Sequence, residues 1–179
     1  QLFGMIHPLM ATTIPLSVST FNKGIFLSGE NGVGKSTLLR TIGINAISAR
    51  SFGFCYANNA SSPKLPVYTS LKNEDSMLEG FSLYVSELKR AREMMEKSEN
   101  EQIGLYLFDE IFRGTNYLES VSAAASVLHN MAKNNIVVVS SHNLMLAPLL
   151  ADRYQSMYIL KNRGNFGLSL HQGVSPQIN

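Results

Sequence analysis

The feature that most constrains the fold of this chain is the stretch SGENGVGKST at residues 28–37. It matches the pattern Gly-x-x-x-x-Gly-Lys-Ser through Gly29, Gly34, Lys35 and Ser36, and it lies between an apolar run and a helical pattern. There, glycines let backbone N–H groups point into one concavity at a helix N-terminus, where the helix dipole favours an anion. The alternative is an ordinary glycine-rich turn, but the flanking strand and helix patterns favour a phosphate-binding loop.

The loop predicts a binding site for a nucleoside triphosphate with Mg²⁺. Lys35 would reach the β- and γ-phosphates, and the Ser36 hydroxyl would bind the metal. The loop residues that we expect to bind nucleotide are Gly29, Glu30, Asn31, Gly32, Val33, Gly34, Lys35, Ser36 and Thr37.

Apolar runs and helical patterns alternate along the chain, which predicts an α/β fold with a mostly parallel central sheet flanked by helices. The strand patterns cover 24–28, 103–110 and 135–142, and an extended piece at PVYTSL follows a long polar loop between about 57 and 73. The tail predicts two further strands around residues 163–165, forming an antiparallel hairpin at one edge of the sheet.

Three segments have helical periodicity. After the glycine loop, the apolar residues Leu38, Leu39, Ile42 and Ala46 recur at helical spacing. Residues 82–98 predict an amphipathic helix with charged residues on a solvated face and an apolar stripe of Tyr84, Leu88, Ala91 and Met95. Residues 117–133 predict a third helix, with Asn134 and Asn135 as its C-cap.

The length of 179 residues suits a single domain, 1–179, with one core. The formal net charge of +2 gives no electrostatic footprint for nucleic acid, so any contact with DNA is local or made elsewhere. The single cysteine, Cys55, excludes an internal disulfide and is expected to be a small buried apolar residue. Without an apolar run long enough to span a bilayer, we expect a cytoplasmic protein with no membrane contact. Because the chain opens with Gln1, it is compatible with a domain excised from a longer protein.

Two acids and a histidine stand at the ends of predicted strands. Asp109 and Glu110 end the strand pattern LYLF, and His142 ends the next one. Because carboxyl ends of parallel strands meet at one edge, where such folds bind ligands, these side chains should lie together. Asp109 would support Mg²⁺, Glu110 would orient and deprotonate the attacking water, and His142 would hydrogen-bond the γ-phosphate. The alternatives are a Glu110 that caps the next segment and a purely structural His142.

Ser82 opens the charged helix pattern, and a helix N-cap is its default interpretation. The alternative is that this helix N-terminus meets the γ-phosphate bound by a second subunit. The remaining histidines, His7, His129 and His171, are predicted to be structural.

Five stretches resemble, in order, the ATPase domain of the MutS family, a branch of the ABC-type P-loop ATPases. They are MIHPLM (5–10), SGENGVGKSTLLR (28–40), EGFSLYVSELKRA (79–91), LFDEIFRGTN (107–116) and VVVSSHNLMLAPL (137–149). The first resembles the family's His-Pro strand, and the others its Walker A, signature, Walker B and switch-histidine segments.

The resemblance implies ATP and Mg²⁺ as cofactors, ADP as product and a homodimer formed through the nucleotide-binding face. Lys35 and Ser36 would bind phosphate and metal, Asp109 the metal, Glu110 the water and His142 the γ-phosphate. Ser82 would act across the dimer interface, and residues 113–116, Arg-Gly-Thr-Asn, would form the interface loop. Adenine contact near His7 and Pro8 is a further expectation of the resemblance. So is DNA binding through segments outside this chain, in DNA repair such as mismatch repair.

Four positions depart from the family's usual mismatch-repair enzymes, which favours a divergent branch. Those enzymes read Asn-Met-Gly-Gly where this chain has residues 31–34, Asn-Gly-Val-Gly, they place Gly at Phe112, and they place Thr at Ser141. The leading hypothesis is a Mg²⁺-dependent ATPase with composite sites between two chains. The alternatives are an ATP-gated dimerisation or partner-binding module with negligible turnover and, more weakly, a small-molecule phosphotransferase.

Overall fold

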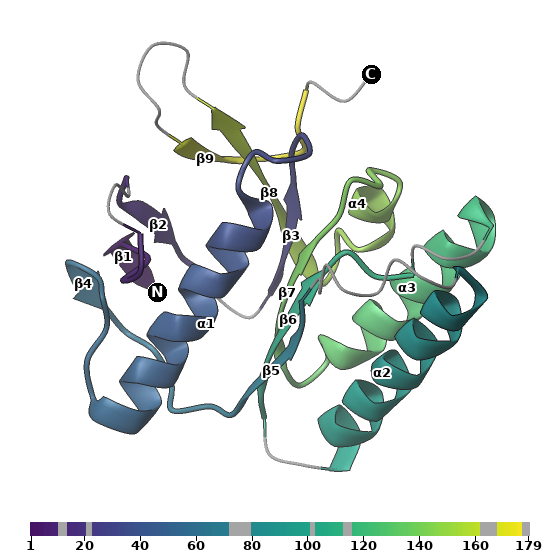
Figure 1. Ribbon diagram of the computed structural model, residues 1–179, viewed down its shortest axis with the longest axis horizontal. Helices are drawn as coiled ribbons and strands as arrows, with labels where there is room; N and C mark the ends of the chain where they lie inside the picture. The colour runs from purple at the N-terminus through teal and green to yellow at the C-terminus, as the bar shows by residue number, and fades with distance from the viewer. Residues whose placement is uncertain are drawn as a thin grey trace.

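The computed structural model describes residues 1–10, 14–20, 23–71, 80–100, 103–112, 116–161 and 168–176, with backbone alone for 80–85 and 100. Its main sheet has six strands in the order β5-β6-β7-β3-β8-β9 (Figure 1). The pairs from β5 to β8 are parallel, and β8 pairs with β9 antiparallel. The strands are β3 (Gly24–Ser28), β5 (Val67–Ser70), β6 (Leu105–Asp109), β7 (Ile136–Ser140), β8 (Tyr154–Lys161) and β9 (Leu168–Gln172). The predicted mostly parallel sheet with an antiparallel edge is confirmed; the predicted turn at 163–165 lies outside the described residues.

Helices cover both faces of this sheet, with α1 on one side and α2, α3 and α4 on the other (Figure 1). Their bounds are α1 (Lys35–Phe52), α2 (Gly80–Asn100), α3 (Tyr117–Met131) and α4 (Leu146–Leu149). Because side chains alternate across a strand, the buried apolar residues form two clusters. Phe108 and Val139 belong to the cluster with α3, and Leu107 and Val138 to the cluster with α1. The prediction of one core is therefore wrong: a sheet covered on both faces has two.

A second, smaller sheet was absent from the sequence-based predictions. It has the order β2-β1-β4, with antiparallel pairing of β1 (Leu2–Met5), β2 (Leu16–Val18) and β4 (Asn59–Ala60). The predicted loop at 57–73 therefore contains β4, although it does lead into the expected extended piece at β5. The His-Pro segment is not itself a strand, because β1 ends at Met5 and residues 8–9 form a turn.

The α2 helix differs from its prediction at its start and in its buried face. It begins at Gly80, so Ser82 lies within the first turn and the N-cap prediction is wrong. Among its described side chains the buried apolar ones are Ala91 and Met94, whereas the side chain of Leu88 is 38% exposed. The burial pattern follows how α2 packs against the sheet and α3, which its own periodicity does not specify.

The α3 helix begins at a side-chain cap, since the Asn116 Oδ1 accepts a hydrogen bond from the Leu118 N–H at 3.1 Å. It ends at Met131 with Ala132 as its C-cap, so the predicted Asn134–Asn135 cap is wrong in position. Asn135 still contributes, because its Nδ2 donates to the Met131 carbonyl at 3.0 Å. The helix ends two residues earlier than the asparagines indicate, and the side chain of Asn135, beyond the turn, satisfies the carbonyl of the last helical residue.

Cys55 is half-buried beside α1, where its thiol lies 3.6 Å from the Asn45 carbonyl oxygen that accepts its hydrogen bond. Burial raises the pKa of this thiol. Within the described residues, no helix is both long and apolar enough to cross a membrane.

Candidate functional site

The carboxyl ends of β3, β6 and β7 meet at one edge of the main sheet. Asp109 at the end of β6 is in register with Ser140 at the end of β7, and Ser140 is in register with Leu27 of β3. Backbone hydrogen bonds continue past the strands, from the Glu110 N–H to the Ser140 carbonyl and from the Ser141 N–H to the Leu27 carbonyl, both at 3.0 Å. The glycine loop, the acids and the histidine segment therefore share this edge, as the sequence predicted.

The glycine loop joins β3 to α1 through backbone conformations that favour glycine. Gly29, Gly32 and Gly34 have φ of 147°, 75° and 111°. A Cβ at Gly29 would lie 3.1 Å from the Ile159 carbonyl oxygen, so the loop also passes close to β8. Gly34 is the left-handed N-cap of α1, and no side chain caps this helix. The loop therefore reaches the N-terminus of α1 through conformations that glycine adopts readily, and backbone N–H groups at a helix N-terminus favour an anion.

The side chain of Lys35 folds back onto the glycine loop and contacts two of the loop's carbonyl groups. Its ammonium group donates to the carbonyl oxygens of Gly29 at 2.6 Å and Glu30 at 2.9 Å, and the residue is only 6% exposed. Ser36 and Thr37, in the first turn of α1, are half-buried. A buried ammonium group therefore lies at the loop that the sequence predicts to bind phosphate.

Asp109 is buried, and its two carboxylate oxygens differ in their contacts. Its Oδ1 accepts from the Ser140 hydroxyl at 2.5 Å, whereas its Oδ2 is buried and has no hydrogen-bond partner among the described residues. A buried polar atom without a partner is costly and indicates a ligand or ordered water at that position. Oxygen is the ligand that Mg²⁺ prefers, and it usually binds one or two protein groups with water and phosphate, so Asp109 fits the expected metal.

Ser140 is the residue of this cluster that sequence reasoning missed. It is fully buried, and its hydroxyl orients Asp109 by the bond described above. The available signal was a hydroxyl residue ending the apolar strand pattern of β7, directly opposite the end of the acid-bearing strand.

Glu110 and His142 lie side by side just beyond the strand ends. The Glu110 Oε1 is 3.5 Å from the His142 Nδ1, and their side chains are 11% and 58% exposed. Both border a cavity of about 270 Å³ whose lining includes Phe112, Tyr117 and Asn143. An acid and an imidazole this close can both contact one ligand in the cavity.

The backbone beside this pair is strained. Glu110 and Phe112 have φ of 58° and 56°, and Phe112 is only 3% exposed. A left-handed conformation is unfavourable for a side chain with a Cβ, so the burial of Phe112 compensates for backbone strain of about 1–2 kcal/mol. Phe112 stands where the family resemblance expects glycine, and the observed φ gives the physical reason for that expectation.

A second cavity, of about 260 Å³, opens beside the glycine loop. Its lining includes Gly32, Val33 and Thr37 of the loop region, together with His7 and Lys161. His7 was predicted as structural, yet it borders this cavity, with its Nδ1 accepting from the Leu9 N–H at 3.3 Å. Lys161 was not predicted; it ends β8, next to the loop-bearing strand.

Some predicted residues lie away from the site or outside the residues that the structure describes. The Ser82 side chain and residues 113–115 lie outside them, and Asn116 caps α3. His129 lies 2.9 Å from Asp152, whose pKa is lowered chiefly by this hydrogen bond. His171 stacks on Tyr158 with ring centroids 5.1 Å apart. Contacts with neighbouring side chains agree with the structural roles predicted for His129 and His171.

The chain is similar in sequence to MutS-related proteins. The family model for MutS domain V matches residues 25–163. The endonuclease MutS2 of Thermus thermophilus is 30% identical over 156 residues, covering 84% of this chain and 20% of that protein. The DNA mismatch repair protein MutS of the same species is 23% identical over 175 residues, covering 95% of this chain and 21% of that protein. The chain thus spans about a fifth of the length of these relatives.

A solved structure shares the fold. A chain in the crystal structure of a complex between an archaeal ribosomal stalk protein and an archaeal ribosome recycling factor superposes with a TM-score of 0.50 at 16% identity. The match covers 88% of this chain and 35% of that chain.

Proposed function

This chain belongs to the MutS domain V family, and on that premise we propose that it binds ATP with Mg²⁺ and hydrolyses it at sites shared between two copies. The observation that carries the proposal is the unpartnered, buried Asp109 Oδ2 at the sheet edge that also bears the glycine loop and Lys35. We further propose that the chain has the P-loop NTPase fold of the ABC/MutS type and that residues 1–179 form a single ATPase domain.

The loop and the acids would divide the work between binding and chemistry. When ATP binds, the Lys35 ammonium group would leave the carbonyl oxygens of Gly29 and Glu30 and contact the β- and γ-phosphates. The backbone N–H groups of 29–34 would donate hydrogen bonds to the same phosphates. Ser36 and Asp109 hold Mg²⁺, which neutralises phosphate charge when bound. Ser140 keeps Asp109 aimed at that position.

Glu110 and His142 would act on the water and the terminal phosphate. Glu110 accepts a hydrogen bond from the attacking water and orients it, and His142 donates to the γ-phosphate or the water.

The 260 Å³ cavity beside the loop is the position that we assign to the adenine. His7 and Val33 border it, with Lys161 and Leu168 from the β8–β9 edge. A mostly apolar wall with a ring to stack on suits a flat base, and the cavity continues from the loop residues Gly32 and Thr37. This supports the expectation of base contact near His7.

A second copy of the chain would complete each site. The signature segment at 79–91, with Ser82 in the first turn of α2, has no assigned role within its own subunit, and Ser82 would contact the γ-phosphate of the partner. Asn116 and residues 113–115 would form the loop between the two sites. Because relatives are named as an endonuclease and a DNA mismatch repair protein, we place the activity in DNA handling or repair, with DNA bound by segments outside this chain.

Nucleotide binding by Lys35→Ala tests this proposal. We measure ATP affinity by equilibrium dialysis with Mg²⁺ and expect at least a tenfold loss, because charge-assisted hydrogen bonds to phosphate contribute roughly 1.5–3 kcal/mol. The matched control is Lys64→Ala, an exposed lysine outside the site, which should leave affinity unchanged. Unchanged ATP affinity in Lys35→Ala would refute the proposal.

A second candidate function is an ATP-gated binding module with negligible turnover. The strained, buried Phe112 next to Glu110 favours it, since it replaces the glycine expected in the family's mismatch-repair enzymes and fixes the acid's backbone. Glu110→Gln separates the two functions. It should abolish measurable turnover if the chain is an ATPase, and it should leave ATP-dependent association and the negligible turnover unchanged if the chain is a gated module.

A further inference from the structure

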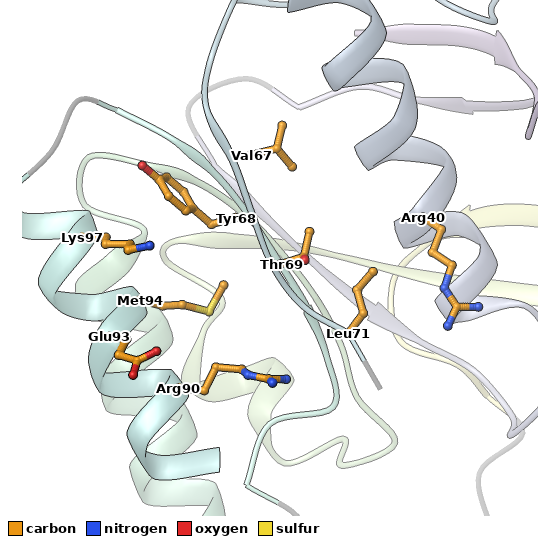
Figure 2. Close-up of a pocket in the computed structure, with 9 residues that line it drawn as sticks. All are labelled: Arg40, Val67, Tyr68, Thr69, Leu71, Arg90, Glu93, Met94 and Lys97. Carbon is orange, nitrogen blue, oxygen red and sulfur yellow. The ribbon is translucent and has the colours of Figure 1, made fainter. Parts of the chain in front are cut away.

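An open groove runs along β5, which lies three strands away from β3, the strand that leads into the glycine loop. It has a volume of about 560 Å³, with β5 as its floor, Arg40 of α1 on one wall, and Arg90, Glu93, Met94 and Lys97 of α2 on the other (Figure 2). Of these residues only Arg90 falls within the 79–91 segment proposed above to face a partner's nucleotide, and it lies near the end of that segment. We therefore consider which ligand, other than the nucleotide, this groove could bind.

The floor of the groove is an unpaired strand edge. β5 is the last strand of the six-stranded sheet, and within the described residues only β6 pairs with it. The Pro66 carbonyl accepts from the Leu105 N–H, so Pro66, Tyr68 and Ser70 direct their backbone groups toward β6. By alternation, Val67 and Thr69 direct their N–H and C=O groups outward, and both line the groove.

The walls carry an excess of positive charge. Arg40, Arg90 and Lys97 face one acid, Glu93, which gives the lining a formal charge of +2 (three cations less one anion). Arg40 and Arg90 are exposed and make no ion pair among the described residues. The Lys97 Nζ lies 5.2 Å from the centre of the Tyr68 ring, which keeps it over the strand. Figure 2 shows Arg40 and Arg90 on opposite sides of β5.

Strand edge and charge together specify the ligand. A small anion would satisfy the guanidinium groups but would leave the outward carbonyls of Val67 and Thr69 without donors. An extended peptide supplies both N–H and C=O groups to the edge, and acidic side chains on its two faces would reach Arg40 on one wall and Arg90 and Lys97 on the other. We infer that this groove binds an extended acidic segment of a partner protein, which adds a strand to β5. The inference goes beyond the proposed ATPase function and does not depend on it.

Peptide binding to this chain tests the charge part of the inference. The probe is a short, end-capped, fluorescent peptide of valine, threonine and glutamate, with glutamates on both faces of an extended strand, and its control has glutamine in their place. We expect the glutamate peptide to bind, the glutamine peptide to bind at least tenfold more weakly, and Arg40→Glu and Arg90→Glu each to weaken binding on the order of tenfold. The matched controls Arg50→Glu on α1 and Lys89→Glu on α2, exposed and outside the groove, should bind as the parent does.

A proline substitution tests the strand-addition part. Thr69→Pro removes an N–H that points to the open edge and is not needed for pairing with β6, a position where proline is tolerated. We expect Thr69→Pro to lose the peptide and Thr69→Val, which keeps the N–H, to retain it. Equal binding of the glutamate and glutamine peptides would overturn the inference, as would full affinity in Thr69→Pro. A single-stranded oligonucleotide that binds with the same arginine dependence while the peptide does not would overturn it in favour of nucleic acid. The charge variants remain decisive if Thr69→Pro fails to fold.

Discussion

At the residue scale, the turn after β6 shows how burial outweighs backbone strain. Phe112 has φ of 56° and is 3% exposed. Burial of a phenylalanine stabilises the fold by more than the backbone strain destabilises it. Truncation of a buried Phe typically costs about 3–5 kcal/mol of stability, whereas the left-handed conformation costs about 1–2 kcal/mol. A phenylalanine therefore persists where glycine is conformationally easier.

When Phe112 is truncated, the glycine variant should be more stable than the alanine variant, which is the reverse of the usual order of stability. Because alanine has a Cβ and glycine has none, Phe112→Gly should be more stable than Phe112→Ala by about 1 kcal/mol, although both should be less stable than the parent. Urea unfolding measures both. Val121 in α3 is the control, where the alanine variant should be the more stable one. An alanine variant at 112 that equals or exceeds the glycine variant would contradict the left-handed backbone.

Ser140 should contribute to stability through Asp109. Its hydroxyl donates to a buried carboxylate oxygen, so Ser140→Ala should lower the free energy of unfolding by about 1–3 kcal/mol. In an Asp109→Asn background, Ser140→Ala should lower the free energy of unfolding by less, because the carboxylate that accepts the Ser140 hydrogen bond has been replaced. Denaturant unfolding of the four proteins gives the coupling, and strictly additive effects would argue against the bond.

At the scale of elements, Asn135 joins a helix end to a strand start. Its Oδ1 accepts from the Gly104 N–H next to β6, and its Nδ2 donates to the Met131 carbonyl at the end of α3, both at 3.0 Å. Two backbone groups from separate elements are thus satisfied by one side chain.

Asn135→Ala should therefore lower the free energy of unfolding by about 1–3 kcal/mol, since two backbone groups lose their partner. The neighbouring Asn134 is exposed, so Asn134→Ala should stay within about 0.5 kcal/mol of the parent. Thermal and urea unfolding of both variants check this. Similar effects at the two positions would show that the contacts of Asn135 do not matter.

At the scale of the whole molecule, the proposed site is complete only when two copies meet. ATP turnover per subunit, measured with Mg²⁺ over a wide range of protein concentration, should rise and then level off as the dimer forms. Turnover that is constant and non-zero at all concentrations, together with a monomer by sedimentation at the lowest one, would contradict a site completed by a partner. Turnover of zero throughout would favour the gated binding module.

Much of the fold was predictable because its signals are local. The periodicity of Leu38, Leu39, Ile42 and Ala46 predicted a helix that buries those residues, and all four are buried in α1. The strand patterns ending at Asp109 and His142 predicted neighbouring ends at one sheet edge, and β6 and β7 pair there. Less of the detailed site was predictable. The bond from Ser140 to Asp109, the strain at Phe112 and the cavity at Lys161 depend on neighbours that are distant in sequence.

The sequence by itself determined the glycine loop, the alternation of strands and helices, and which residues stand at strand ends, since these follow from backbone conformation and periodicity within a few residues. Only the tertiary structure decided that β7 lies between β3 and β6, that α2 buries Met94 rather than Leu88, and that β5 is the last described strand of the main sheet, with Arg40 of α1 and Arg90 and Lys97 of α2 beside it. The physical reason is that strand order and helix rotation are selected by the packing free energy of the entire chain. No short stretch of sequence contains both partners of such contacts.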